Sequence, residues 1–77
     1  MTSEESFEVF WSEYPVGRKV CKRIARKAWN KIPSPEAHLL EILAGLMEWK
    51  NSAQWQNINY VPYPATFLNR CQWEETP

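Results

Sequence analysis

The side chains best suited to binding a ligand are seven cations that lie within one short segment. Residues 17–32 hold seven Lys and Arg and no acid, whereas residues 1–16 hold four Glu and no cation. The seven are Arg18, Lys19, Lys22, Arg23, Arg26, Lys27 and Lys31. Like charges four positions apart on a helix repel by roughly a few tenths of a kcal/mol per pair. A phosphate backbone would account for that tolerated repulsion. The alternative is a solvated face balanced by the acidic N-terminal residues.

Other reactive side chains are few and scattered. His38 is the only histidine, Cys21 and Cys71 stand far apart, and all nine acids are Glu. A zinc site takes about four Cys, His or carboxylate ligands, and a nucleophilic triad would depend on His38 alone. Gly17 and Gly45 are too few for a phosphate-binding loop. We therefore expect no enzyme activity, no metal and no cofactor, and we interpret both cysteines as reduced, small buried hydrophobes.

Apolar spacing, N-caps and prolines predict four helices. A capping-box pattern of Thr2 and Glu5 begins the first, and Pro15 ends it. Pro33 ends the second, and Ser34 is the expected N-cap of the third. The predicted ranges are Ser3–Glu13, Arg18–Lys31, Ser34 to about Lys50, and a short last helix that opens at Pro64.

These elements predict an all-α fold, a small bundle of three main helices plus a short C-terminal helix. The length allows one domain over residues 1–77, with ends that fray at about 1–3 and 74–77. No segment has the length and apolar character of a membrane span, and the N-terminus has no secretory signal pattern. We therefore expect the protein in the cytoplasm.

The predicted second helix has two contrasting faces. At 100° per residue, its expected core face carries Cys21, Ile24, Ala25, Ala28 and Ile32. The opposite face carries Lys19, Lys22, Arg23 and Arg26, with Trp29 at the border. This helix is thus expected to show a cation array to the solvent.

Aromatic side chains gather in two further places. The first helix carries an apolar stripe, which we expect to pack on the Leu-rich third helix: Phe7, Phe10, Trp11 and Tyr14. Residues 53–63, here called the aromatic–proline loop, read as an ordered but irregular segment. Pro62 and Pro64 force their preceding residues to be extended.

Three runs of residues resemble one known family. The first is Phe7-x-x-Phe10-Trp11-x-x-Tyr14-Pro15, and the second is Arg18 to Lys22 with Ala25 to Lys31. The third is Trp55 with Tyr60-Val61-Pro62-Tyr63-Pro64-Ala65-Thr66-Phe67-Leu68-Asn69 and Trp73-Glu74. Together they resemble the C-terminal module of phage and prophage replication proteins, the replisome organisers and related primosomal helicase loaders. The resemblance implies a small helical domain in a phage or prophage setting, and therefore in a bacterial host cell. It also implies that the domain works near single-stranded DNA or a replicative helicase.

The cation array and the resemblance together predict a replication accessory that binds nucleic acid, with single-stranded DNA favoured. The expected phosphate contacts are Lys19, Lys22, Arg23, Arg26 and Arg70. The expected base-stacking residues are Trp55, Tyr60 and Tyr63. The alternative hypothesis is a protein-interaction module, or a small phage inhibitor, that binds a host protein such as a replicative helicase. It would use the aromatic–proline loop and the acidic first helix.

Overall fold

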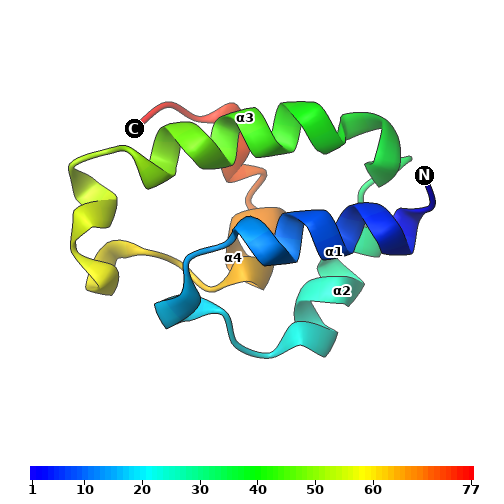
Figure 1. Cartoon of the computed structure of the whole chain (residues 1–77), viewed down its shortest axis with the longest axis horizontal. Coiled ribbons are helices and arrows are strands. Elements are labelled where there is room, and N and C mark those ends of the chain that lie inside the picture. The colour runs from blue at the N-terminus through cyan, green and yellow to red at the C-terminus, as the bar shows by residue number, and fades with distance from the viewer.

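The computed structural model describes all residues, 1–77, as helices joined by short turns, with no strand (Figure 1). The α-helices are α1 (Ser3–Glu13), α2 (Lys22–Asn30), α3 (Leu39–Lys50) and α4 (Pro64–Asn69). Five short 3-10 helices join or follow them: η1 (Val16–Arg18), η2 (Pro35–His38), η3 (Gln54–Gln56), η4 (Ile58–Tyr60) and η5 (Gln72–Glu74). The prediction of an all-α fold with three main helices and a short fourth is confirmed.

The helices form a compact arrangement around α1. In Figure 1, α3 and α1 lie side by side and run in the same direction, and α2 lies on the other side of α1. The short α4 lies behind α1 and packs against α2, and η5 packs against α3. No helix is both long and apolar enough to cross a membrane.

The capping box forms as the sequence predicts. The Glu5 backbone N–H donates to Thr2 Oγ1 at 3.1 Å, and the Thr2 backbone N–H donates to Glu5 Oε1 at 2.8 Å. These hydrogen bonds with Thr2 hold the pKa of the Glu5 carboxyl below its usual value, because they favour the charged form. At the other end, Tyr14 is extended before Pro15, so α1 ends where the proline predicts.

The core is a connected group of aromatic rings. Phe67 of α4 lies at its centre. The centre of its ring is 6.0 Å from the ring centre of Phe10, 5.8 Å from that of Tyr14 and 5.9 Å from that of Trp55. Trp29, which we expected at the border of its helix, is fully buried and stacks on Phe10 at 5.3 Å. The rings of α1 therefore contact aromatic side chains of α2 and α4, and α1 also packs against the Leu-rich α3.

The second helix is shorter than predicted, and its buried face is rotated. Cys21 adopts φ 55°, a left-handed backbone that interrupts the helix, so residues before it form η1 and a turn. The side chains that α2 buries are Ala25, Ala28 and Trp29, while Ile24 is exposed. The expected core position of Ile24 is therefore wrong.

Both cysteines are free and both are exposed, so the expectation that they are buried is wrong. Cys21 precedes α2, and Cys71, with φ 52°, precedes η5. Each lies at the bend between two elements rather than on a packed helix face. The third helix also starts differently: Ser34, with φ 47°, makes no capping hydrogen bond, because an N-cap needs an extended backbone.

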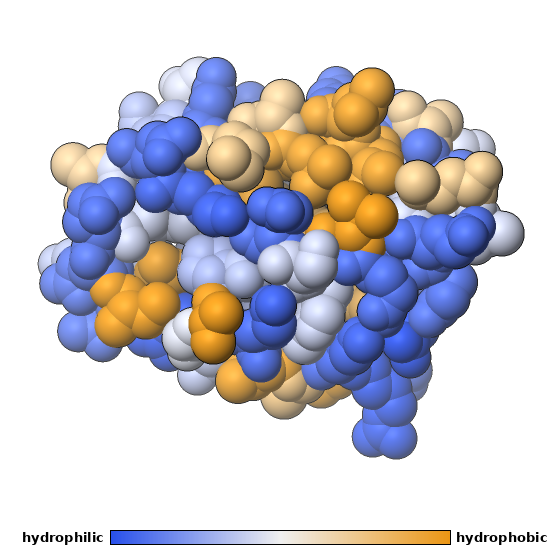
Figure 2. All heavy atoms as spheres, viewed as in Figure 1, coloured by the Kyte–Doolittle hydropathy of each residue, from blue (hydrophilic) through white to orange (hydrophobic).

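An apolar stripe on α3 faces solvent. Leu40 is 82% exposed and Met47 is also exposed, and Figure 2 shows apolar atoms gathered over this helix. The other half of α3 buries Ile42, Leu46 and Trp49 in the core. The helix is therefore apolar on a wider face than the domain itself covers.

Candidate nucleic-acid interface

One edge of α2 is already neutralised by α1. Lys22 Nζ lies 2.7 Å from Glu8 Oε1, and Arg26 Nε lies 3.0 Å from Glu4 Oε1. Arg26 Nη2 is also 3.8 Å from Glu8 Oε1. Exposed ion pairs of this kind stabilise little, about 0–1 kcal/mol each, but they occupy the cations. Two of the predicted phosphate ligands, Lys22 and Arg26, therefore face carboxylates within the domain.

These two cations, together with Lys19, lie over aromatic side chains of α1. The ammonium groups of Lys19 and Lys22 lie 5.9 Å and 5.7 Å from the centre of the Trp11 ring. The Arg26 guanidinium lies 5.4 Å from the centre of the Phe7 ring. Such cation–π contacts favour the charged groups over the ring faces. Trp11, expected as part of the buried stripe, is partly exposed at this edge.

The outer face of α2 keeps its positive charge. Arg23, Lys27 and Lys31 are exposed, and none of them forms an ion pair. Their spacing of four positions places them on one side of the helix, one above the next, about 6 Å apart along the axis. Hydrophilic side chains cover the part of the surface over α2 (Figure 2). The structure therefore assembles a row of cations, of which only Arg23 was predicted as a site residue.

Two exposed tyrosines lie at the opposite end of the same edge. Tyr60 is 61% exposed and Tyr63 is 50% exposed. The Arg18 guanidinium lies 5.4 Å from the centre of the Tyr63 ring, and Arg18 Nε donates to the Ile58 carbonyl oxygen at 3.0 Å. These contacts join η1 to η4, so η4, η1 and α2 follow one another along one edge (Figure 1).

The aromatic–proline loop is held from inside the core. The Tyr14 hydroxyl donates to the Pro62 carbonyl oxygen at 2.7 Å, and burial raises the pKa of the Tyr14 phenol. Trp55 is only 6% exposed and its ring lies 6.0 Å from Tyr14, so it cannot stack on a base. The prediction that Trp55 is an exposed stacking residue is wrong, because its ring is packed in the core.

The two remaining predicted cations are dispersed. Lys19 lies in the turn between η1 and α2 rather than on the helix. Arg70, at the end of α4, lies 3.8 Å from Glu75 Oε1. The predicted set therefore comes together only in part: Lys19 and Arg23 are free for a ligand, along with Tyr60 and Tyr63.

A signal for the neutralised edge was present in the sequence. Glu4 and Glu8 are four positions apart on α1, and Lys22 and Arg26 are four positions apart on α2. Two such pairs can meet when the helices lie side by side. No group of three His, Cys or acidic side chains is close enough to hold a metal ion.

Comparison with protein families gives a match over most of the chain. The family described as Legionella vir region protein LvrA C-terminal domain matches residues 2–70, nearly the whole chain. The resemblance to phage and prophage replication modules is therefore wrong, since a different family accounts for the same residues. No curated protein and no solved structure matches the chain.

Proposed function

The chain belongs to the LvrA C-terminal domain family, and from its surface we propose that it binds single-stranded nucleic acid, with DNA as the favoured form. The proposal rests on one observation. Among the cations of α2, the acids of α1 pair only with Lys22 and Arg26, so the outer face of α2 keeps Arg23, Lys27 and Lys31 without a carboxylate partner. A polyanion is the ligand that such a row of one sign would attract.

The tyrosines support a single strand over a duplex. Proteins that bind single strands combine a positive track for the backbone with aromatic rings on which bases stack. Here Lys19 and the α2 row form the track, and Tyr60 and Tyr63 offer exposed rings beside Arg18. Bases in a duplex are already stacked on one another and have no free face to offer. We place this activity in the cytoplasm of a bacterial cell.

The number of phosphate contacts gives a measurable salt dependence. Lys19, Arg23, Lys27 and Lys31 together would make four contacts. On a single strand each contact contributes about 0.7 to the slope of log K against log salt, so the expected slope is about −2.8. Fluorescence anisotropy of a labelled single-stranded oligonucleotide, measured from about 50 to 200 mM salt, would give this slope.

Two matched arginine variants test the assignment. Arg23→Gln should reduce the slope by about 0.7, because it removes one contact. Arg70→Gln makes the same change in charge at an arginine that lies near Glu75, and it should leave the slope unchanged. Equal effects of the two variants would mean that net charge, not the α2 row, governs binding. If the unmodified protein showed no binding at about 50 mM salt, where non-specific affinity is favoured, the proposal would fail. A protein partner on the exposed stripe of α3 would then be the better hypothesis.

A further inference from the structure

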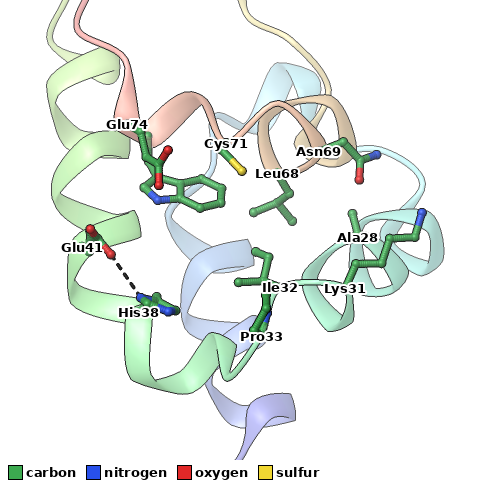
Figure 3. A pocket seen from close by; sticks show the side chains of 11 residues that line it. Ala28, Lys31, Ile32, Pro33, His38, Glu41, Leu68, Asn69, Cys71 and Glu74 are labelled. Carbon is green, nitrogen blue, oxygen red and sulfur yellow. Dashed lines mark hydrogen bonds and ion pairs between the residues drawn. The ribbon is translucent and has the colours of Figure 1, made fainter.

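A pocket of about 470 Å³ lies where the cation row of α2 ends (Figure 3). The end of α2, the start of α3, and the connection from α4 to η5 enclose it. Ile32, Leu68 and Trp73 supply its apolar lining. This volume is within the range of small-molecule sites, which are typically about 300–1,000 Å³.

The polar groups of the pocket are divided between its two sides. In Figure 3, Lys31 and Asn69 lie on one side, while His38, Glu41 and Glu74 lie on the other. Glu41 Oε2 is 3.2 Å from His38 Nδ1, and Glu41 Oε1 has no hydrogen-bond partner. The pocket thus has a cation and an amide at one end, an apolar middle, and carboxylate acceptors at the far end.

We propose that this pocket holds one unpaired nucleotide. A nucleotide has the same three chemistries in the same order: an anionic phosphate, a flat base with apolar faces, and hydrogen-bonding groups on the base edge. Lys31 would contact the phosphate, Ile32 and Leu68 would contact the base, and Glu41 Oε1 would accept from its edge. This inference rests on the proposed function, because Lys31 is also the last cation of the α2 row.

The Glu41 carboxylate would make the pocket prefer some nucleotide bases over others. An ionised carboxylate only accepts hydrogen bonds, so Glu41 favours a base with an exocyclic amino group. Adenine, cytosine and guanine carry one, and thymine does not. The only edge donor of thymine, N3–H, lies between two carbonyl oxygens, which would be set against the carboxylate and weaken that hydrogen bond. The pocket should therefore discriminate against thymidine nucleotides.

The two exposed cysteines provide a direct test. Cys71 lines the pocket and Cys21 does not, so their alkylation rates report on the pocket and on a control position in the same molecule. The probe is 2′-deoxyadenosine 5′-monophosphate, with thymidine 5′-monophosphate and deoxyribose 5-phosphate as comparisons. At about ten times the dissociation constant, the adenine nucleotide should slow Cys71 alkylation about tenfold, because only the free fraction reacts. The rate at Cys21 should not change.

A matched pair of glutamate variants tests the base preference. Glu41→Gln replaces the carboxylate with an amide, which can also donate to thymine, and it should reduce the preference for adenine over thymine roughly tenfold. Glu48→Gln makes the same change two turns later on α3, outside the pocket, and should leave the preference unchanged. Both side chains are exposed, so neither variant should unfold the domain.

The outcomes separate this inference from the proposed function. Oligonucleotide binding with the expected salt slope, but without Cys71 protection by any nucleotide, would overturn the pocket and leave the cation row standing. Cys71 protection by the mononucleotide without oligonucleotide binding would support the pocket as a site for free nucleotides and overturn the proposed function. Equal protection by all three probes would overturn base recognition.

Discussion

At Gly45, the structure and helix propensity predict opposite effects of an alanine substitution on the stability of the fold. It lies within α3, where replacing Gly by Ala normally stabilises a helix by about 1 kcal/mol. In this fold, however, Gly45 is buried and faces Trp73 of η5. A Cβ built on Gly45 would lie 2.6 Å from Trp73 Cβ and 2.7 Å from Trp73 Cα, and it would also meet the Trp73 carbonyl oxygen.

The loss of stability in Gly45→Ala can be estimated from how far η5 would have to move. Ordinary contacts between carbon atoms are about 3.5–4.0 Å, so η5 would have to shift by roughly 1 Å. Overpacking of this kind costs about 1–3 kcal/mol. The shift would also strain the hydrogen bonds that Trp49 Nε1 donates to the carbonyl oxygens of Gln72, at 3.0 Å, and Glu75, at 3.1 Å. After the gain in propensity is subtracted, Gly45→Ala should reduce the free energy of unfolding by up to about 2 kcal/mol.

Thermal unfolding followed by circular dichroism would measure this change. For a domain of this size, 1 kcal/mol corresponds to about 4–8 °C in Tm. The exposed neighbour provides the control, because Ala44→Gly should lower stability by about 1 kcal/mol through propensity alone. Both substitutions should therefore lower Tm, although they exchange the same two residue types in opposite directions. A higher Tm for Gly45→Ala would refute the close packing of α3 against η5.

Two further predictions concern backbone and capping. Ser34→Gly should raise the free energy of unfolding by about 0.5 kcal/mol, visible as a higher Tm, because glycine adopts the φ of 47° without the strain that a side chain causes there. An unchanged or lower Tm would contradict the left-handed backbone at this position. The Glu5 carboxyl should contribute to stability above its unfolded pKa, and this contribution should be lost as the pH falls through the lower pKa of the folded state. The Tm difference between the unmodified protein and Glu5→Ala should thus be greatest near neutral pH and should shrink between about pH 5 and 3, whereas a difference independent of pH would contradict the capping box.

The sequence predicted α1 to the residue because every signal for it is local. Thr2 and Glu5 lie one turn apart, and Pro15 restricts the residue before it. The last helix also begins at Pro64 as predicted, and the positions of the second and third helices were predicted, but their starts were not. Cys21 and Ser34 adopt a left-handed backbone conformation. Neither Cys nor Ser favours that conformation as glycine does, so the sequence did not predict it.

The candidate site was predicted less well, because pairing between helices decides it. The sequence alone showed a cation array and an acidic first helix, and both exist. Which cations remain free depends on the packing of α1 beside α2, where residues more than ten positions apart meet. The prediction therefore named Lys22 and Arg26, which face carboxylates, and left out Lys27 and Lys31.

What the sequence determined by itself was the helical class, the course of α1 and the concentration of positive charge in one segment. These follow from periodicity, capping and composition, which act over a few residues. Only the tertiary structure decided which aromatic rings face water and where the pocket lies. Trp55 is buried because α4 brings Phe67 against it, and the pocket exists because α2, α3 and η5 meet around Leu68 and Trp73. Burial and cavities depend on contacts between distant segments, so no local pattern in the chain could specify them.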